Sequence, residues 1–419
     1  MTDREFATDV VRRLRDAGFE ALWAGGCVRD ELLGHSPEDY DVATNARPEQ
    51  VRGAFRRTIE VGASFGVIEV IGPKLGDKYM TVQVATFRSD VSYSDGRRPD
   101  AVKFCSAEED AKRRDFTING MFFDPLENKL IDYVGGQADL HSKLLRAIGD
   151  PHARFTEDKL RLLRAVRFAA RFKMAIEPAT LAAIREMSDQ ITVVSAERIA
   201  DELRKLLADP ERVRALQLMA ETGVLAAILP EVAQKYGMSD GQWQSFAAVV
   251  GHLPRSAGFL LSFAAMLHDV ASTPIQASVI AETVATRLRL SNSERACIAW
   301  LVDKHTALNS AQSMRMSILK PLLASVHIPD LFDLHRAIAR AQSTGVEHVE
   351  FAENKLKEWT ASGELNPPPL ITGNDLHRLG LTPGPGFKQF LDAVRDAQLD
   401  GTISTSAEAL ALVDQLRRS

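Results

Sequence analysis

The sequence predicts an α+β protein in which a strand-rich first part is followed by a long helical part. Two β-branched runs, Val67–Ile71 and Thr81–Thr86, lie between glycines or polar turns, as is typical of strands. From about Leu140 onward the chain is rich in alanine and leucine and has few β-branched runs, which indicates helices. A chain of 419 residues is too long for a single hydrophobic core, so we expect three or four units.

The first element with a functional meaning is a glycine turn. The apolar run at 21–24 is followed by Gly25-Gly26 and then by Cys27–Leu33, which has a helical pattern. A strand, a tight turn and a helix start in this order direct backbone N–H groups at an anion. Arg29 adds a guanidinium, which suits phosphate oxygens. A glycine pair alone would indicate only a tight turn, so its meaning depends on the neighbouring residues.

A pair of aspartates, Asp39 and Asp41, comes shortly after this turn. Residues i and i+2 of a strand point to the same face, so we expect the two carboxylates to project together. They would repel each other unless a cation lay between them, and Mg²⁺ is the usual oxygen-binding partner. In isolation, Asp-x-Asp could decorate a polar turn. After the glycine turn, it predicts a site for a triphosphate and its metal ions.

Two stretches are predicted to lack regular structure. The segment Arg88–Lys103 is polar, carries both charges and has no period, which is typical of a mobile loop. The prolines at 367–369 interrupt the helical part and predict a rigid elbow before a last helical unit.

A second polar motif runs from Arg113 to Asn119. Adjacent arginines offer donors to phosphate, and Asp115, Thr117 and Asn119 offer groups suited to ribose hydroxyls. The alternative is a helix N-terminus capped by Asp115.

A third motif is predicted to lie on a helix that includes Glu157. Steps of three residues place Asp158, Arg161 and Arg164 within a sector of roughly 120°. A carboxylate beside a guanidinium presents an acceptor and a donor, which the edge of a nucleobase requires. The alternative is an intrahelical salt bridge on a solvated face. Arginines in register (Arg161, Arg164, Arg167) repel one another unless something anionic lies alongside.

The composition sets limits on the setting of the protein. Three cysteines, widely separated and odd in number, fit a reducing cytoplasm without disulfides or a thiolate metal site. No stretch approaches the ~18 apolar residues of a membrane span, and no secretory segment is evident. A net charge of −5 argues mildly against a nucleic-acid partner, but the segment 154–173 is locally basic. Nothing in the sequence points to a protein partner.

Together the motifs resemble those of the bacterial class II tRNA nucleotidyltransferases, the CCA-adding enzymes and their poly(A) polymerase relatives. The resemblance runs in order through the chain, over Gly25–Asp30, Asp39–Asp41, Arg113–Asn119, Glu157–Arg161, Ser195–Leu206 and Pro369–Gly384.

This resemblance implies a four-part molecule. A small mixed-sheet nucleotidyltransferase head would occupy residues 1–140, and a helical neck that selects the base would occupy 141–206. A helical body would span 207–345 and a helical tail that binds tRNA would span 346–419. The implied reaction is template-independent addition of CCA to the 3′ end of tRNA from CTP and ATP, with release of pyrophosphate.

The resemblance also implies roles for individual residues. Asp39 and Asp41 would be catalytic and bind two Mg²⁺ ions. Asp158 and Arg161 would pair with the edge of cytosine or adenine. The other residues that it implies for the nucleotide site hold phosphates (Gly26, Arg29), hold the sugar (Arg114, Asp115), complete the pocket (Asn119) or support the base-pairing residues (Arg164, Arg167).

Some choices stay open within the family. A third carboxylate often follows the aspartate pair, but Gln83 stands on the strand before Thr86, so either Glu69 serves or two aspartates suffice. Relatives that add only CC tend to lack a flexible loop, which Arg88–Pro99 retains. Full CCA addition, addition of A alone and poly(A) synthesis are not separated by these motifs.

Two other function classes compete with this interpretation. His268-Asp269, with His305 downstream, resembles the metal-dependent phosphohydrolases that carry a His-Asp pair, although His252 is the only upstream candidate. We expect this part to be a degenerate domain kept as scaffold. A catalytically dead RNA-binding protein is disfavoured by the intact aspartate pair.

Overall fold

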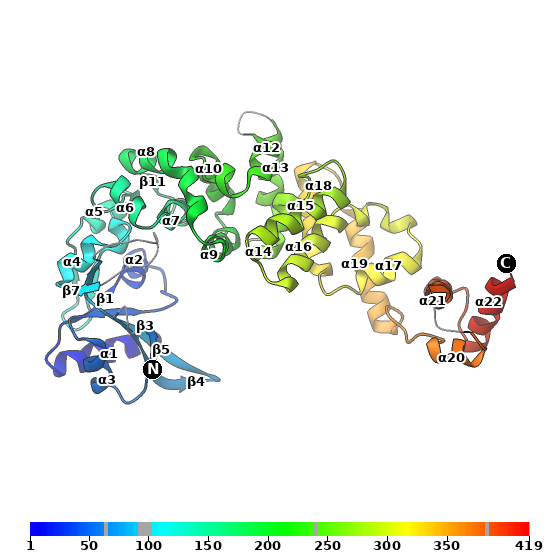
Figure 1. Cartoon of the computed structure of the whole chain (residues 1–419), viewed down its shortest axis with the longest axis horizontal. Helices are drawn as coiled ribbons and strands as arrows, with labels where there is room; N and C mark the ends of the chain where they lie inside the picture. The colour runs from blue at the N-terminus through cyan, green and yellow to red at the C-terminus, as the bar shows by residue number, and fades with distance from the viewer. Residues whose placement is uncertain (63–65, 91–101, 238–240, 382–384, 419) are drawn as a thin grey trace. The chain divides into compact units, whose positions relative to one another are not determined.

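The computed structural model describes residues 1–62, 66–90, 102–237, 241–381 and 385–418. Its contacts divide the chain into two compact units, Met1–Gln234 and Lys235–Ser419. Figure 1 shows the first unit from blue to green and the second from green to red. The four-part division stays a prediction, because the contacts separate only these two units.

The first unit contains a seven-stranded sheet of order β3-β4-β5-β2-β1-β8-β9. Strand β2 runs parallel to β5, and the other neighbours are antiparallel, so the predicted mixed sheet is confirmed. The strands are β1 (Ala21–Ala24), β2 (Asp41–Thr44), β3 (Thr58–Gly62), β4 (Val67–Leu75), β5 (Lys78–Thr86), β8 (Phe122–Asp124) and β9 (Lys129–Ile131).

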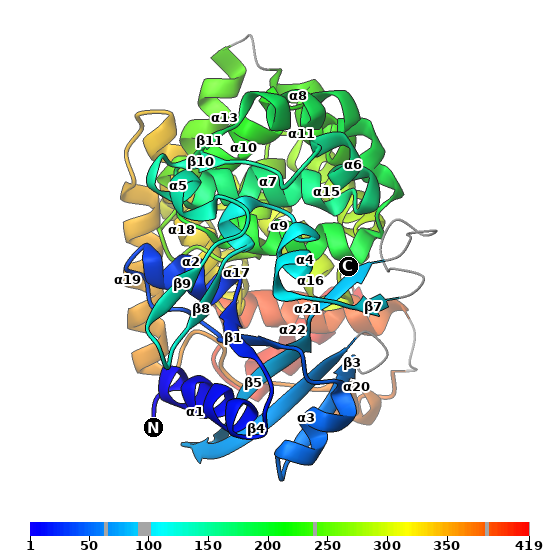
Figure 2. The same ribbon diagram turned by 90° about the vertical axis from the view of Figure 1, so that its left-hand side faces the viewer.

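Helices cover both faces of this sheet, which is why β1 is apolar at every position. Leu22 and Ala24 pack in a cluster with Ala107 and Ala111 of α4 (Ala107–Lys112). Alternate residues of a strand point to opposite faces, so Trp23 faces the other way. There α1 (Asp3–Asp16) lies against β1, β2 and β5 (Figure 2). The guanidinium of Arg4 on this helix lies 5.1 Å from the ring centre of Trp23. The other helices of this part are α2 (Gly26–Leu32) and α3 (Pro48–Ala54).

The predicted loop at Arg88–Lys103 contains strand at both ends. β6 (Arg88–Asp90) pairs antiparallel with β7 (Val102–Phe104), so the loop prediction was wrong there. Backbone pairing can form a short ribbon from a polar sequence without a hydrophobic period, which is why the pattern did not show it. Residues 91–101, which carry most of the prediction, lie outside the described residues, as do Pro383 and Gly384 of the last motif.

The rest of the first unit is helical apart from one pair of two-residue strands, β10 (Leu144–Leu145) and β11 (Ala175–Ile176). Its helices are η2 (Thr117–Asn119), α5 (Gly136–His141), α6 (Pro151–Glu157), α7 (Leu160–Arg171), α8 (Pro178–Met187), η3 (Ser188–Val193), α9 (Ala196–Ala208), α10 (Arg212–Glu221) and α11 (Val224–Ile228), with α12 (Pro230–Tyr236) spanning the unit boundary.

The regular secondary structure in the described part of the second unit consists of helices only. The triple proline lies between α19 and α20, outside any helix, as predicted. The helices are α13 (Gly241–His252), α14 (Phe259–Leu267), α15 (Pro274–Arg287), α16 (Asn292–Lys304), η4 (Ala307–Ser313), α17 (Met316–Leu323), α18 (Ile328–Ala341), α19 (Glu347–Ser362), α20 (Gly373–Arg378), α21 (Pro385–Leu399) and α22 (Ser406–Arg418). Among the described residues, no helix has both the length and the apolar character that crossing a membrane requires.

Candidate active site

The turn between β1 and α2 has a backbone conformation that favours glycine. Gly25 has φ 71° and ψ −118°, and α2 begins at Gly26. A Cβ at Gly25 would lie 2.7 Å from Nη1 of Arg114, so a side chain there would strain the backbone and displace the Arg114 guanidinium. The predicted order of strand, glycine turn and helix is confirmed.

The two aspartates after this turn are not both on a strand. Asp41 is the first residue of β2, whereas Asp39 precedes it. The prediction of alternate positions on one strand was therefore wrong. Strand β1 ends where the glycine turn begins, and its pairing with β2 extends only to Val42, so it offers Asp39 no partner. Both side chains nevertheless line one pocket.

Asp39 and Asp41 form a set of oxygen ligands that suits a hard divalent cation. Burial and, after it, the charge of Asp39 raise the pKa of Asp41 to about 6. A cation between the two carboxylates would relieve the repulsion between their negative charges, and Mg²⁺ prefers carboxylate oxygens as ligands. The residues present therefore fit the metal that the sequence predicts.

Glu69, the candidate third carboxylate, lies away from this pair. Gln83 of β5 is the register partner of Asp41, and Glu69 of β4 is the register partner of Gln83. Two strand spacings separate Glu69 from Asp41 by roughly 10 Å. Glu69 does not line the pocket, and no cluster of three or more His, Cys, Asp or Glu able to hold a metal occurs among the described residues. The structure thus favours the two aspartates over a triad with Glu69.

The pocket that contains the aspartates has a volume of about 610 Å³ and brings together the head and the helices after it. Every site residue that the sequence predicts lines it: Gly26, Arg29, Asp39, Asp41, Arg114, Asp115, Asn119, Asp158, Arg161, Arg164 and Arg167. Gly25, Leu160 and Phe168 also contribute, with four further basic residues: Arg113, Arg171, Arg198 and Lys205. Nine basic and four acidic side chains therefore face one cavity, so a polyanion is favoured there although the whole chain is acidic.

A buried carboxylate outside the predicted set holds the two adjacent arginines. Asp110 accepts from Nη2 of Arg113 at 2.7 Å through one oxygen and from Nη2 of Arg114 at 3.0 Å through the other. Burial alone would raise the pKa of Asp110, but Arg114 and Arg113 outweigh it and the pKa is lowered. Asp110 therefore stays ionised and fixes the direction of both guanidiniums.

Asp115 links the motif Arg113–Asn119 to helix α7. One carboxylate oxygen accepts from the backbone N–H of Phe116 and from Nδ2 of Asn119, at 2.8 and 3.0 Å. The other accepts from Nε and Nη2 of Arg164, at 2.9 and 2.7 Å. These four bonds fill the lone pairs of the carboxylate, so the geometry favours a supporting role for Asp115 over direct contact with a sugar. It caps no helix, because η2 begins after Phe116.

Arg29 is held in a largely apolar corner of the same pocket. Its Nη1 donates to Oδ1 of Asn119, and its Nη2 lies 2.8 Å from Asp30. The guanidinium carbon also lies 4.5 Å from the ring centre of Phe172 and 5.2 Å from that of Phe168. Burial lowers the pKa of Arg29, although Asp30 acts in the opposite direction.

The motif from Glu157 to Arg167 is broken at Asp158 and does not form one helix. Asp158 has φ −147° and ψ 105°, between α6 and α7. The predicted common helical sector of Asp158, Arg161 and Arg164 was therefore wrong. The physical reason is the aspartate itself, whose Oδ1 accepts from the N–H of Leu160 at 3.0 Å and so replaces a helical bond at the start of α7. The pocket still brings Asp158 and Arg161 together.

Arg161, Arg164 and Arg167 of α7 each pair with a carboxylate, which answers the predicted repulsion. Arg161 is buried and pairs with Glu157 of α6 at 2.6 Å, across the break at Asp158, so this pair is not the intrahelical salt bridge on a solvated face that was the alternative. Arg164 pairs with Asp115 at 2.7 Å. Arg167 pairs with the buried Glu202 of α9. The negative charges that these neighbouring arginines require are thus supplied by carboxylates of the protein itself.

Family models match two stretches of the chain. The model described as the poly(A) polymerase head domain matches residues 21–146. The model described as a probable RNA and SrmB-binding site of polymerase A matches residues 173–236.

Whole-length similarity decides the family. The CCA-adding enzyme of Geobacillus sp. (strain WCH70) is 32% identical over 414 residues, which cover 96% of this chain and 95% of that enzyme. The chain belongs to the CCA-adding enzyme family. The CCA-adding enzyme of Geobacillus thermodenitrificans is 42% identical, but over 58% of this chain and 57% of its own length. For the first relatives, therefore, the alignment spans little more than half of their length.

Solved structures of CCA-adding enzymes have the same fold. The Bacillus stearothermophilus CCA-adding enzyme in complex with CTP matches with a TM-score of 0.79 and 26% identity, over 100% of this chain and 98% of that one. The Thermotoga maritima CCA-adding enzyme matches with a TM-score of 0.63 at 20% identity, which shows the fold alone.

The sequence prediction missed several pocket residues of this member of the CCA-adding enzyme family. Arg198 and Lys205 line the pocket from α9, and the Glu202 that holds Arg167 lies between them. Spacings of four and three residues place these side chains on one face of a helix, so the pattern was present in the sequence. Arg171 was missed as well, whereas Arg113 belongs to the pair of adjacent arginines predicted from the sequence as phosphate donors.

The His-Asp pair of the second unit lies in a pocket of its own. His268 is buried, its Nδ1 donates to the carbonyl of Ala265, and Asp269 pairs with Lys235 at 3.6 Å. A pocket of about 210 Å³ is lined by these two residues and by His305, His335 and His348. Within the described ranges, three or more of these side chains do not come together as metal ligands.

Proposed function

We propose that this chain adds CCA to the 3′ end of tRNA, without a nucleic-acid template, from CTP and ATP. One observation carries the proposal: the aspartate pair Asp39 and Asp41 and the pair Asp158 and Arg161 line the same pocket. The first pair suits nucleotidyl transfer and the second suits recognition of a base. Relatives aligned along almost the whole chain are CCA-adding enzymes, and the enzyme with the matching structure binds CTP.

The proposed reaction forms a bond between the 3′ oxygen of tRNA and the α-phosphorus of the nucleotide, and it breaks the bond to pyrophosphate. Asp39 and Asp41 would hold two Mg²⁺ ions, which when bound lower the pKa of the attacking hydroxyl and neutralise charge on the phosphates. Arg29 would hold the triphosphate beside the glycine turn at Gly26, and Arg114 would hold the sugar, since both guanidiniums are already fixed in direction, by Asn119 and Asp110.

Choice of base would depend on Asp158 and Arg161. Cytosine and adenine both present an exocyclic amino donor, whereas uracil and guanine present a carbonyl acceptor at the corresponding position. A carboxylate acceptor therefore favours the first two bases and rejects the others. Arg164 and Arg167 would support this pair through Asp115 and Glu202. We assign the tail, residues 346–419, to tRNA binding and the reaction to the cytoplasm as parts of the same proposal.

The proposal is tested on tRNA that ends at the discriminator base, incubated with Mg²⁺, CTP and ATP, followed by sequencing of the products. We expect CCA on every extended molecule, and loss of extension with EDTA that Mg²⁺ restores. Incorporation of A alone on tRNA ending in CC, without any use of CTP, would show an A-adding enzyme. Long A tails would show a poly(A) polymerase.

Two variants separate chemistry from base choice. Asp39→Ala should abolish incorporation of every nucleotide, whereas Arg161→Ala should mainly relax the choice among nucleotides. Asp77→Ala, in the exposed turn between β4 and β5, is the control and should behave as the unmodified chain. Equal loss of every nucleotide in both pocket variants would contradict the role of Arg161 in base choice.

A further inference from the structure

We propose that Arg198 is a specificity-determining positioning residue that holds Asp158 in the direction needed to accept a base amino group. The proposal rests on the function proposed above, in which Asp158 and Arg161 recognise the base. Arg198 comes from α9, whereas Asp158 and Arg161 lie at and after the junction of α6 and α7.

The backbone around Asp158 does not fix the direction of its side chain. Asp158 has extended backbone angles between two helices, so no helical turn restrains it. The N–H of Leu160 binds one oxygen only, at 3.0 Å. Arg198 supplies the remaining restraint, because Nη1 donates to Oδ1 at 3.1 Å and Nη2 donates to Oδ2 at 2.7 Å. Two parallel bonds from a planar fork fix the plane of the carboxylate.

The same bonds determine how much of the carboxylate stays open. An ionised carboxylate offers about four lone-pair positions, two on each oxygen. Oδ1 accepts from Leu160 and Arg198, and Oδ2 accepts from Arg198. Counting the partners within the described residues, one position remains, on Oδ2. One position suits one amino hydrogen of cytosine or adenine.

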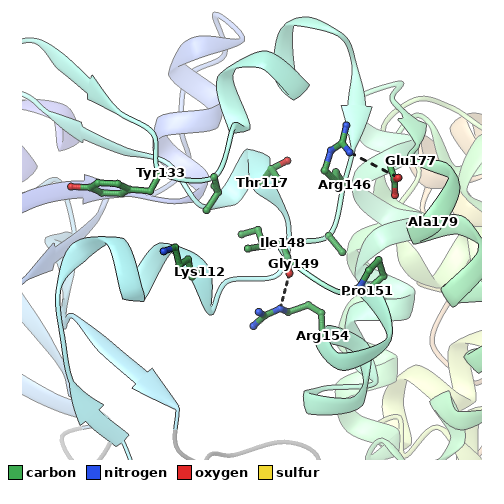
Figure 3. Close-up of a pocket in the computed structure, with 12 residues that line it drawn as sticks. Lys112, Thr117, Tyr133, Arg146, Ile148, Gly149, Pro151, Arg154, Glu177 and Ala179 are labelled. Atoms are coloured by element: carbon green, nitrogen blue, oxygen red, sulfur yellow. Dashed lines mark hydrogen bonds and ion pairs between the residues drawn. The ribbon is translucent and has the colours of Figure 1, made fainter.

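Arg161 is held by a different set of atoms. Its Nη1 donates to Glu157 at 2.6 Å and to the carbonyl of Arg154 at 2.9 Å, and its Nη2 donates to the carbonyl of Arg113 at 3.2 Å. Arg154 is fixed in turn, since its Nε donates to the carbonyl of Ile148 at 3.1 Å, as Figure 3 shows. Asp158 and Arg198 take no part in these bonds. Loss of Arg198 should therefore release the acceptor and leave the donor in place.

The experiment compares Arg198→Met and Arg198→Lys with the unmodified chain. The kcat and KM for CTP, UTP, ATP and GTP are measured on tRNA ending at the discriminator base and on tRNA ending in CC. We expect the preference for CTP over UTP and for ATP over GTP to fall about 10- to 100-fold in Arg198→Met, the loss of one charge-assisted pair. Arg198→Lys keeps the charge but not the fork, so its preference should be intermediate.

Arg204→Met is the matched control, because Arg204 is on the same helix, pairs with the exposed Asp201 and is not among the pocket-lining side chains. Its preference should equal that of the unmodified chain. The same substitutions are also made together with Asp158→Ala. If Arg198 acts through Asp158, Arg198→Met should change nothing further there. Full addition of the two effects, or an unchanged preference in Arg198→Met, would overturn the proposal.

A binding measurement separates this proposal from the proposed reaction. The dissociation constants of CTP and UTP are measured by calorimetry for each variant, with thermal unfolding as the check on folding. A chain that transfers no nucleotide would refute the proposed function, yet a CTP preference in binding that Arg198→Lys reduces would still support the role of Arg198. If Arg198→Met does not fold, this comparison of Arg198→Lys with the unmodified chain decides the outcome.

Discussion

Three buried carboxylates organise the arginines of the pocket. Asp110 holds Arg113 and Arg114, Asp115 holds Arg164, and Glu202 holds Arg167. Removing one partner of a buried ion pair lowers the stability of the fold, because the other charge stays buried without compensation. These pairs therefore hold the guanidiniums in fixed directions before a nucleotide binds. The sequence predicted the arginines and Asp115. It did not predict Asp110, although the spacing of three and four residues to Arg113 and Arg114 is local, nor Glu202, which meets Arg167 only where the chain folds back.

At the scale of single residues, Gly25→Ala tests the glycine turn. Its positive φ should cost the variant about 1–2 kcal/mol of the free energy of unfolding, and the contact with Arg114 should raise the KM for nucleotides. Denaturant unfolding and steady-state kinetics measure the two effects. Gly18→Ala is the control, since φ there is 85° but a Cβ would meet nothing within 4 Å. An equal KM in both variants would contradict a role for the approach of Arg114.

At the scale of elements, the structure differs from the sequence prediction in two places. The predicted helix is interrupted at Asp158, and the face of α9 that lines the pocket was not predicted. Three-residue spacing predicted one helix through the motif, and the structure has two, because a side-chain oxygen of Asp158 replaces a backbone acceptor. Leu160, Leu163 and Phe168 are buried as the helical pattern of α7 predicts. The spacing of apolar residues therefore predicted which residues of the helix are buried, but it did not predict where the helix begins.

The helices of the second unit bury two histidines, and this predicts sensitivity to acid. Burial lowers the pKa of His268, which directly follows α14, and of His335 in α18 to about 4. The ring centre of His305 lies 5.3 Å from that of His268, and the ring centre of His348 lies 5.5 Å from that of His335. The folded state favours the neutral rings. Their contribution to stability is thus complete above the unfolded pKa of about 6.5 and is lost as the pH falls toward 4. The loss is on the order of 3 kcal/mol for each histidine.

Denaturant unfolding at pH 7 and pH 5 measures this effect. We expect His335→Gln to show a smaller drop in the free energy of unfolding between the two pH values than the unmodified chain. His252→Gln, at an exposed position of the same unit, is the control and should show the full drop. The same drop in His335→Gln as in the control would refute the assignment to the buried ring.

At the scale of the whole molecule, the chain consists of two compact units, and the whole candidate site lies in the first. Each unit has an apolar cluster of its own. In the second unit, Ile371, Leu376, Val394, Ala409 and Val413 pack together, and Asp400 accepts from the backbone N–H of Ser317 at 2.7 Å, which ties the end of the chain to α17. Binding of nucleotide and binding of tRNA are therefore expected to be separable.

A fragment of residues 1–234 tests this separation. We expect it to fold and to bind CTP with about the same Kd as the full chain, because it contains every residue that lines the pocket. It should bind tRNA much more weakly, because the proposed tRNA-binding tail is absent. Calorimetry with CTP and filter binding of tRNA measure the two affinities. Equal tRNA affinity of the fragment and the full chain would refute the assignment of the tail.

The sequence by itself determined the fold class, the glycine turn, the family and most of the residues that line the pocket. These follow from local patterns: period, turn chemistry and short motifs of fixed spacing. Only the tertiary structure decided which charges meet, namely Arg198 with Asp158, Arg164 with Asp115 and Arg167 with Glu202. The reason is physical. An ion pair between residues about 35 to 50 positions apart depends on how helices pack and on the rotamers that burial permits, and neither leaves a periodic mark in the sequence.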